Sequence, residues 1–150
     1  MNSRTQGQVY VALQFGLLLA LAVLCTMEMK RSFPGPVPWL YWLVGIALGL
    51  WTLTVNRLGN FNIHPEPRKG GQLVQSGPYR WLRHPMYSSV LLLAVGCAFW
   101  VGSLAGWALF VALAAVLVAK AKLEEEWLLR SYPQYADYQR HTWRLIPRIY

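Results

Sequence analysis

A histidine placed just before a proline is the most distinctive polar feature of this chain. Arg83-His84-Pro85 precedes a long apolar stretch. Proline suits the first turn of a helix and holds the residue before it extended, so Pro85 is expected to begin a helix with His84 at its start. Free backbone N–H groups and the helix dipole favour an anion there. The pattern predicts an anion site at a membrane surface; a loop whose arginines meet lipid phosphates is the open alternative.

Three adjacent carboxylates, residues 124–126, follow the last apolar stretch. Adjacent acids repel one another, so some compensation is expected. Glu126 and Arg130 form a favourable i,i+4 pair on a helix, and that pair accounts for only one of the acids. We expect the helix to end near Ser131, before Pro133. The remaining acids are therefore candidates for ligand binding.

The C-terminal tail adds aromatic and basic groups. Tyr135, Tyr138 and Thr142 are spaced as one face of a helix, and Arg144 follows. Tyrosines in such a pattern more often pack against neighbours or headgroups than against a ligand. Their nearness to the carboxylates and to a histidine at a helix start favours a shared site.

Other chemistries find little support. A zinc site from His64, His84, His141 and a glutamate has no recognised ligand spacing, so no metal is expected. Asp137 is the only aspartate and no nucleophile elbow is present. Gly70-Gly71 is an isolated pair and no phosphate-binding loop.

The composition is that of an integral membrane protein. Of 150 residues, 55% are hydrophobic and 13% are charged, against roughly 25% charged in a soluble domain. Both cysteines, Cys25 and Cys97, lie in apolar runs, so a disulfide framework is not expected. The formal charge of +8 would suggest a protein that binds nucleic acid, but the positions of the basic residues along the chain have another explanation.

Apolar stretches divide the chain into four expected membrane spans. Residues 9–27 and 37–55 form the first two. We expect the first to be a retained membrane anchor and not a cleaved signal peptide. Residues 86–119 carry no charge; one helix of that length would measure about 51 Å, against a hydrocarbon core of about 30 Å. We therefore expect helices over 86–101 and 103–122 with a turn at Gly102-Ser103. The fold class is all-α: about four transmembrane helices in a single domain over 1–150, with a helical loop at the cytoplasmic face and a C-terminal tail.

The basic residues predict the orientation. All but Lys30 and Arg31 of the 14 lysines and arginines fall on one side of these spans. The positive-inside rule then places both termini, the middle loop and the candidate site in the cytoplasm. The excess charge is a topology signal, helped by anionic lipids, and needs no nucleic acid.

Small residues suggest how the spans pack together, and aromatic residues suggest where the span ends meet the membrane surface. Gly45 and Gly49 form a Gly-x-x-x-Gly pair, which allows close helix approach or arises by chance in such a segment. Several aromatic residues near the span ends are expected to be membrane anchors: Trp39, Tyr41, Trp42, Trp100 and Trp107.

Four ordered motifs carry a resemblance to a known family. They are Gly77-Pro78-Tyr79-Arg80, Arg83-His84-Pro85-Met86-Tyr87, Glu125-Glu126-x-Leu128-Leu129 and the tail from Tyr135 through Tyr138, Thr142 and Arg144 to Ile146-Pro147. This order resembles the isoprenylcysteine carboxyl methyltransferase and phospholipid methyltransferase family. The match runs from Pro65 to the C-terminus, about half the chain.

The resemblance implies a small helical membrane enzyme that binds S-adenosylmethionine at the cytoplasmic face. Its methyl group would pass to a lipid-attached or amphiphilic acceptor that arrives from the bilayer. The implied catalytic residues are His84 and Tyr87. The implied cofactor-binding residues are Arg83, His84, Pro85, Tyr87, Glu125, Glu126, Tyr135, Tyr138 and Arg144. One departure is Ser89, where the family usually has glycine; its hydroxymethyl group would narrow the approach of a cofactor to the helix.

The chemistry of these residues agrees with that assignment. A helix start suits the cofactor's carboxylate, a glutamate suits its ammonium or ribose hydroxyls, and tyrosine faces suit its sulfonium. His84 is the candidate base if the acceptor must lose a proton. We expect His84 and Glu125 or Glu126 to line one site, with Glu124 a solvated neighbour.

Two other functions stay open. Membrane sterol reductases have a similar His-Pro-x-Tyr region but bind NADPH and are much longer. A non-enzymatic membrane subunit with a polar docking tail is the second alternative, and it predicts that His84→Ala or Glu125→Gln leaves the phenotype intact.

Overall fold

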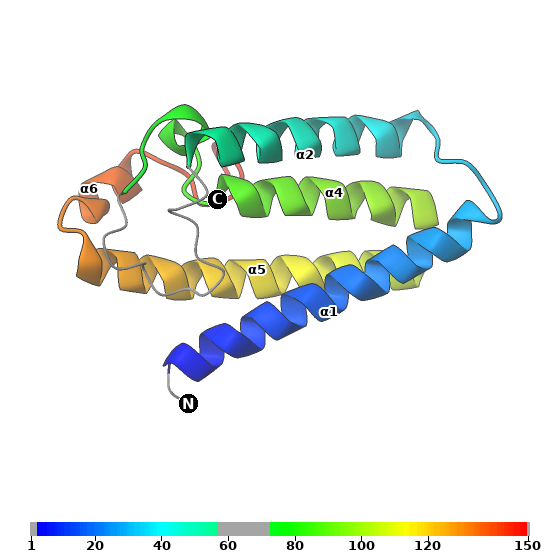
Figure 1. The fold of residues 1–150 in the computed structure, drawn as a ribbon, viewed down its shortest axis with the longest axis horizontal. Coiled ribbons are helices and arrows are strands. Elements are labelled where there is room, and N and C mark those ends of the chain that lie inside the picture. The colour runs from blue at the N-terminus through cyan, green and yellow to red at the C-terminus, as the bar shows by residue number, and fades with distance from the viewer. Residues whose placement is uncertain (1–2, 57–72, 150) are drawn as a thin grey trace.

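The computed structural model describes residues 3–56 and 73–149, which form a bundle of long helices with a small polar cap (Figure 1). Its elements are α1 (Ser3–Met29), α2 (Pro36–Val55), the short 3-10 helix η1 (Gly77–Arg80), α4 (Pro85–Val101), α5 (Leu104–Ser131) and α6 (Tyr135–Arg140). His64 and Gly70-Gly71 lie outside the described residues.

The helix ends confirm the local signals in the sequence. Pro85 occupies the first turn of α4, and α5 ends at Ser131 just before Pro133. The expected turn joins α4 and α5. Gly102 there adopts φ of 62°, a left-handed conformation that glycine tolerates best. The Ser103 hydroxyl then caps α5 by accepting the Gly106 N–H at 3.2 Å.

α4 lies between α2 and α5, and α1 crosses the bundle against α5 and α4 (Figure 1). The buried apolar core lies where α1, α4 and α5 meet. Its members are Leu21, Ala94, Leu113 and Leu117. This arrangement makes the third and fourth expected spans direct neighbours, as the short turn requires.

The contact between α2 and α4 depends on small residues. The Ser89 hydroxyl donates a hydrogen bond to the Gly45 carbonyl at 2.8 Å. A Cβ atom added at Gly49 would lie 2.7 Å from the Ser89 Oγ, and one at Gly45 would lie 3.1 Å from Leu93. The Gly-x-x-x-Gly pair is therefore a packing device, and Ser89 faces α2. The effect of Ser89 on the approach of a cofactor to α4 stays a prediction.

The chain is an integral membrane protein. Among the residues that the structure describes, three helices are long and apolar enough to cross a membrane: Thr5–Met29, Pro36–Val55 and Leu104–Ser131. α4 is apolar but has 17 residues, about 25 Å, at the lower limit for a span. The expected count of four therefore depends on α4. Large apolar side chains such as Phe15, Leu19 and Leu43 are exposed on the bundle surface, as lipid-facing residues are.

Polar elements gather at one end of the bundle. The end of α2, η1, the start of α4, the end of α5 and α6 all lie there, and α1 begins on the same side (Figure 1). The α4–α5 turn lies at the opposite end. The candidate residues of the loop and of the tail are thus brought to one face, while the orientation of that face remains a prediction.

Candidate functional site

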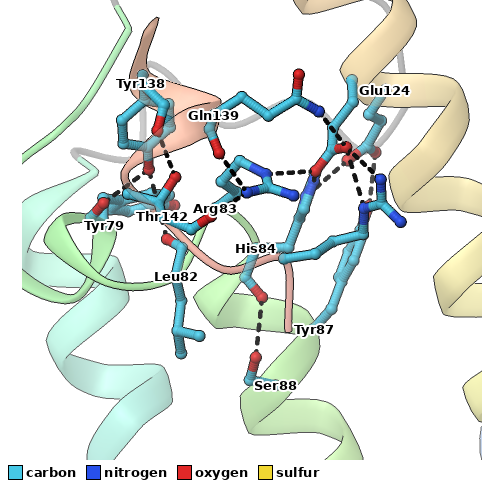
Figure 2. Close-up of polar contacts among 12 residues, drawn as sticks. Tyr79, Leu82, Arg83, His84, Tyr87, Ser88, Glu124, Tyr138, Gln139 and Thr142 are labelled. Carbon is cyan, nitrogen blue, oxygen red and sulfur yellow. Dashed lines mark hydrogen bonds and ion pairs between the residues drawn. The ribbon is translucent and has the colours of Figure 1, made fainter. Parts of the chain in front are cut away.

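His84 lies between two carboxylates of α5. Its Nδ1 is 3.4 Å from Glu124 Oε2, and its Nε2 is 3.2 Å from Glu125 Oε1 (Figure 2). Burial of the imidazole disfavours its charge, but the hydrogen bonds and charges of Glu124 and Glu125 outweigh burial, and the pKa of His84 is raised above its ordinary value. Both ring nitrogens face acceptors, which suits the doubly protonated imidazolium.

The Glu125 carboxylate contacts side chains from the start of α4, from α6 and from the tail. Its side chain is 3% exposed, and it receives Arg83 Nε at 2.7 Å and Arg144 Nη2 at 2.7 Å. Gln139 Nε2 donates to the same carboxylate at 3.1 Å. Such a buried carboxylate is stable only when charged partners and hydrogen bonds satisfy it. Glu125 therefore ties the start of α4 and the C-terminal tail to α5.

Glu124 also belongs to the site, contrary to expectation. The Tyr87 hydroxyl donates to Glu124 Oε1 at 2.5 Å, and the Tyr87 ring stacks on His84 with centroids 5.4 Å apart. Glu126 is exposed. The register of α5 explains the correction: the buried face runs through Leu117, and Glu124, seven residues on, continues it, whereas position 126 is half a turn away.

The tail pairs with the residues that precede α4, through an isolated parallel β-bridge between Leu82 and Trp143. The Arg83 N–H donates to the Trp143 carbonyl at 2.8 Å, and the His84 N–H donates to the Arg144 carbonyl at 3.1 Å. The Arg83 guanidinium also donates to the carbonyls of Gln139 and Thr142. The backbone N–H groups of residues 83 and 84, which directly precede α4, are therefore paired with the tail.

The two tail tyrosines have different surroundings. The Tyr138 hydroxyl donates to the Tyr79 carbonyl at 2.7 Å, which fastens α6 to η1 (Figure 2). Tyr135 is 1% exposed, and within the described part of the chain its hydroxyl has no hydrogen-bond partner. Burial and the charge of Glu125 raise the pKa of Tyr135, so its hydroxyl stays protonated and can donate.

Lys120 and Gln14 are polar residues of this region that the motifs did not indicate. Lys120 is 4% exposed, its Nζ donates to Gln14 Oε1 at 3.0 Å, and it lies 5.1 Å from the centre of the Tyr87 ring. A signal was present in the sequence, because Gln14 is the one amide side chain within the expected first span, residues 9–27. The sequence alone predicts Lys120 only as one of the basic residues that set the membrane orientation.

The structure thus brings most of the predicted site residues together. Those in the cluster or packed against it are Arg83, His84, Pro85, Tyr87, Glu125, Tyr135, Tyr138 and Arg144. Glu126 is left outside. His141 is exposed beside Asp137, and no three metal-ligating side chains converge within residues 3–56 and 73–149.

Two curated proteins are similar in sequence to this chain. The chain is 37% identical over 103 residues to the cobalt-zinc-cadmium resistance protein CzcN of Cupriavidus metallidurans, covering 68% of this chain and 47% of that protein. It is 33% identical over 103 residues to the nickel-cobalt-cadmium resistance protein NccN of Alcaligenes xylosoxydans xylosoxydans, covering 68% of this chain and 48% of that protein. The chain therefore spans about half the length of these curated relatives.

The family model for phospholipid methyltransferase matches residues 39–135, from α2 to the start of α6. That range contains both sides of the cluster, the start of α4 and the end of α5. The chain is a member of the phospholipid methyltransferase family.

Proposed function

We propose that this protein transfers the methyl group of S-adenosylmethionine to a lipid-attached or amphiphilic acceptor at the cytoplasmic membrane face. The observation that carries the proposal is the meeting of His84 and Tyr87 with Glu124 and Glu125 at one end of an apolar bundle. Family membership supplies the reaction class. S-adenosylmethionine supplies an activated methyl group on a sulfonium sulfur.

The residues present fit such a cofactor, with roles that differ from the first assignment. Both oxygens of Glu125 are engaged by Arg83, His84, Gln139 and Arg144, so Glu125 acts by positioning those groups. Glu124 has fewer internal partners and is the carboxylate we assign to the cofactor's ammonium or ribose hydroxyls.

Tyr135 contributes to the fit. Its buried hydroxyl lacks a partner among the described residues, and such a group is costly unless a ligand satisfies it. We assign this hydroxyl as a donor to the bound cofactor. Tyr87 is engaged with Glu124 through its hydroxyl, so its proposed contribution is to orient that carboxylate.

The two carboxylates that face the ring nitrogens of His84 favour its protonated form, and this narrows the class of acceptor. An imidazolium held by two carboxylates has no lone pair with which to remove a proton. In this state His84 orients Glu124 and Glu125 and does not serve as the base. The arrangement favours an acceptor that arrives deprotonated, for example a carboxylate, because methyl transfer then needs positioning and exclusion of water alone.

The location supports entry of the acceptor from the bilayer. The cluster lies at the start of α4 and the end of α5 (Figure 1), and both helices are apolar beyond it. An acceptor with a hydrocarbon tail can remain in the lipid while its polar end reaches the site. The charged cofactor enters from water.

The test is calorimetric titration of the detergent-solubilised full chain with S-adenosylmethionine, and separately with NADPH. We expect saturable binding of S-adenosylmethionine, weakened by Glu124→Gln and unchanged by the matched control Glu126→Gln. Binding of NADPH instead favours the reductase alternative and overturns the proposal.

A cellular test addresses the non-enzymatic alternative. Both curated relatives are named as metal-resistance proteins, so metal tolerance is the phenotype we propose to follow. Loss of the phenotype in a stably expressed Glu124→Gln variant supports enzymatic function. An intact phenotype in Glu124→Gln and His84→Ala supports a subunit role.

A further inference from the structure

Lys120 is a buried cation next to the site that the proposed mechanism does not use. It lies one helical turn before Glu124 on α5 and is 4% exposed. A buried ammonium is costly unless it is paired and hydrogen-bonded. The groups around it are the Gln14 amide oxygen at 3.0 Å, the Tyr87 ring at 5.1 Å and the negative field of Glu124.

These contacts connect α1 to the catalytic end of the bundle. Gln14 is itself 9% exposed, and its carbonyl accepts from Lys120. Lys120 lies over the ring of Tyr87, and the Tyr87 hydroxyl donates to Glu124. Glu124 in turn faces His84. One continuous set of contacts therefore leads from α1 to the carboxylate assigned to the cofactor.

We propose that Lys120 and Gln14 are positioning residues of the site: Gln14 holds the Lys120 ammonium where it fixes the Tyr87 ring and balances the charge of Glu124. The inference deepens the proposed function and rests on it wherever cofactor affinity is the readout. Gln14 lies outside residues 39–135, the range matched to the family. The site is thus completed by a helix that the family match does not include.

The experiment compares Gln14→Leu, Lys120→Met and the double variant in the detergent-solubilised full chain. Exposed residues on the same helices provide matched controls, Gln8→Leu on α1 and Lys122→Met on α5. Thermal unfolding and the affinity for S-adenosylmethionine are measured for each. Lys120→Arg tests rescue, since it keeps the charge.

The double variant separates positioning from simple packing. Replacing both partners by apolar groups leaves no buried polar atom unpaired, so the unfolding temperature should recover toward wild type. The affinity should stay about tenfold below wild type, because the Tyr87 ring, and with it Glu124, is no longer held in position. Lys120→Arg should retain most of the affinity. Recovery of both stability and affinity in the double variant overturns the inference and leaves the pair a packing contact.

A second readout does not depend on the cofactor. NMR titration of the His84 imidazole reports its surroundings, which include Glu124, Glu125 and Tyr87 and the two guanidinium groups of the cluster. Loss of the Lys120 charge should raise the titration midpoint by about half a pH unit, whereas Lys122→Met should not move it. An unmoved midpoint in Lys120→Met contradicts the inference. If wild type fails to bind S-adenosylmethionine, the proposed function falls while this titration still decides the role of Lys120.

Discussion

His84 Nε2 lies 3.2 Å from Glu125 Oε1, although 41 residues separate them in the chain. The contact exists because Pro85 begins α4 next to the end of α5, and the turn at Gly102 makes those helices antiparallel neighbours. Arg83 and Arg144 complete the pairing of the same carboxylate. The predictions below follow from this cluster and from the helix contacts that hold it.

The three glutamates of α5 should have three different effects. Glu125→Gln should lower the free energy of unfolding by about 3 kcal/mol, because it leaves buried cations without their counter-charge. Glu124→Gln should mainly weaken cofactor binding, and exposed Glu126→Gln should change either quantity little. Thermal unfolding and calorimetry of the three variants test this. Equal losses at all three positions would show that the acids act only as a charge patch.

The raised pKa of His84 predicts a pH dependence of stability. A group whose pKa is higher in the folded state stabilises the fold fully below its unfolded pKa, about 6.5. That contribution is lost as pH rises through the folded pKa. Unfolding temperatures of wild type and His84→Asn, measured from pH 5.5 to 9, should therefore converge as pH increases. A difference that grows with pH would contradict the assignment of an imidazolium.

Where α2 crosses α4, the space between Gly49 and Ser89 should hold the Ser89 side chain but no second side chain at position 49. Gly49→Ala places a Cβ atom against the Ser89 Oγ and should cost about 1–3 kcal/mol by overpacking. Adding Ser89→Gly to Gly49→Ala should recover part of that loss, because the clash is removed. Ser89→Gly alone should lose about 1 kcal/mol with its hydrogen bond to Gly45. Thermal unfolding of the three variants measures the cycle, and additive losses would refute direct contact.

Membrane orientation can be tested by labelling. In a Cys25→Ser/Cys97→Ser background, Leu104→Cys marks the α4–α5 turn and His141→Cys marks the polar end. Both positions are exposed. An impermeant thiol reagent added to whole cells should label position 104 and spare position 141, as the distribution of basic residues predicts. The reverse labelling pattern would invert the topology.

Much of the fold is determined by local sequence. Uninterrupted apolar stretches specify helices that lie in a membrane, because backbone groups in lipid must bond internally. Pro85, Gly102 with Ser103, and Pro133 then set where helices begin, turn and end, since each fixes backbone conformation or hydrogen bonding within a few residues. The motifs around His84 and Glu125 likewise identified the two segments that meet.

Tertiary structure alone decided how those segments use their polar groups. Glu124 lies in the cluster and the predicted Glu126 does not, because packing on α1 and α4 defines which face of α5 is buried. Lys120 of α5 and Gln14 of α1 form a hydrogen bond although they are 106 residues apart in sequence. No local pattern specifies such a distant contact. The N–H groups of residues 83 and 84 are paired because the tail folds back over them. Long-range packing sets which charges are buried together, and burial sets what those charges can do.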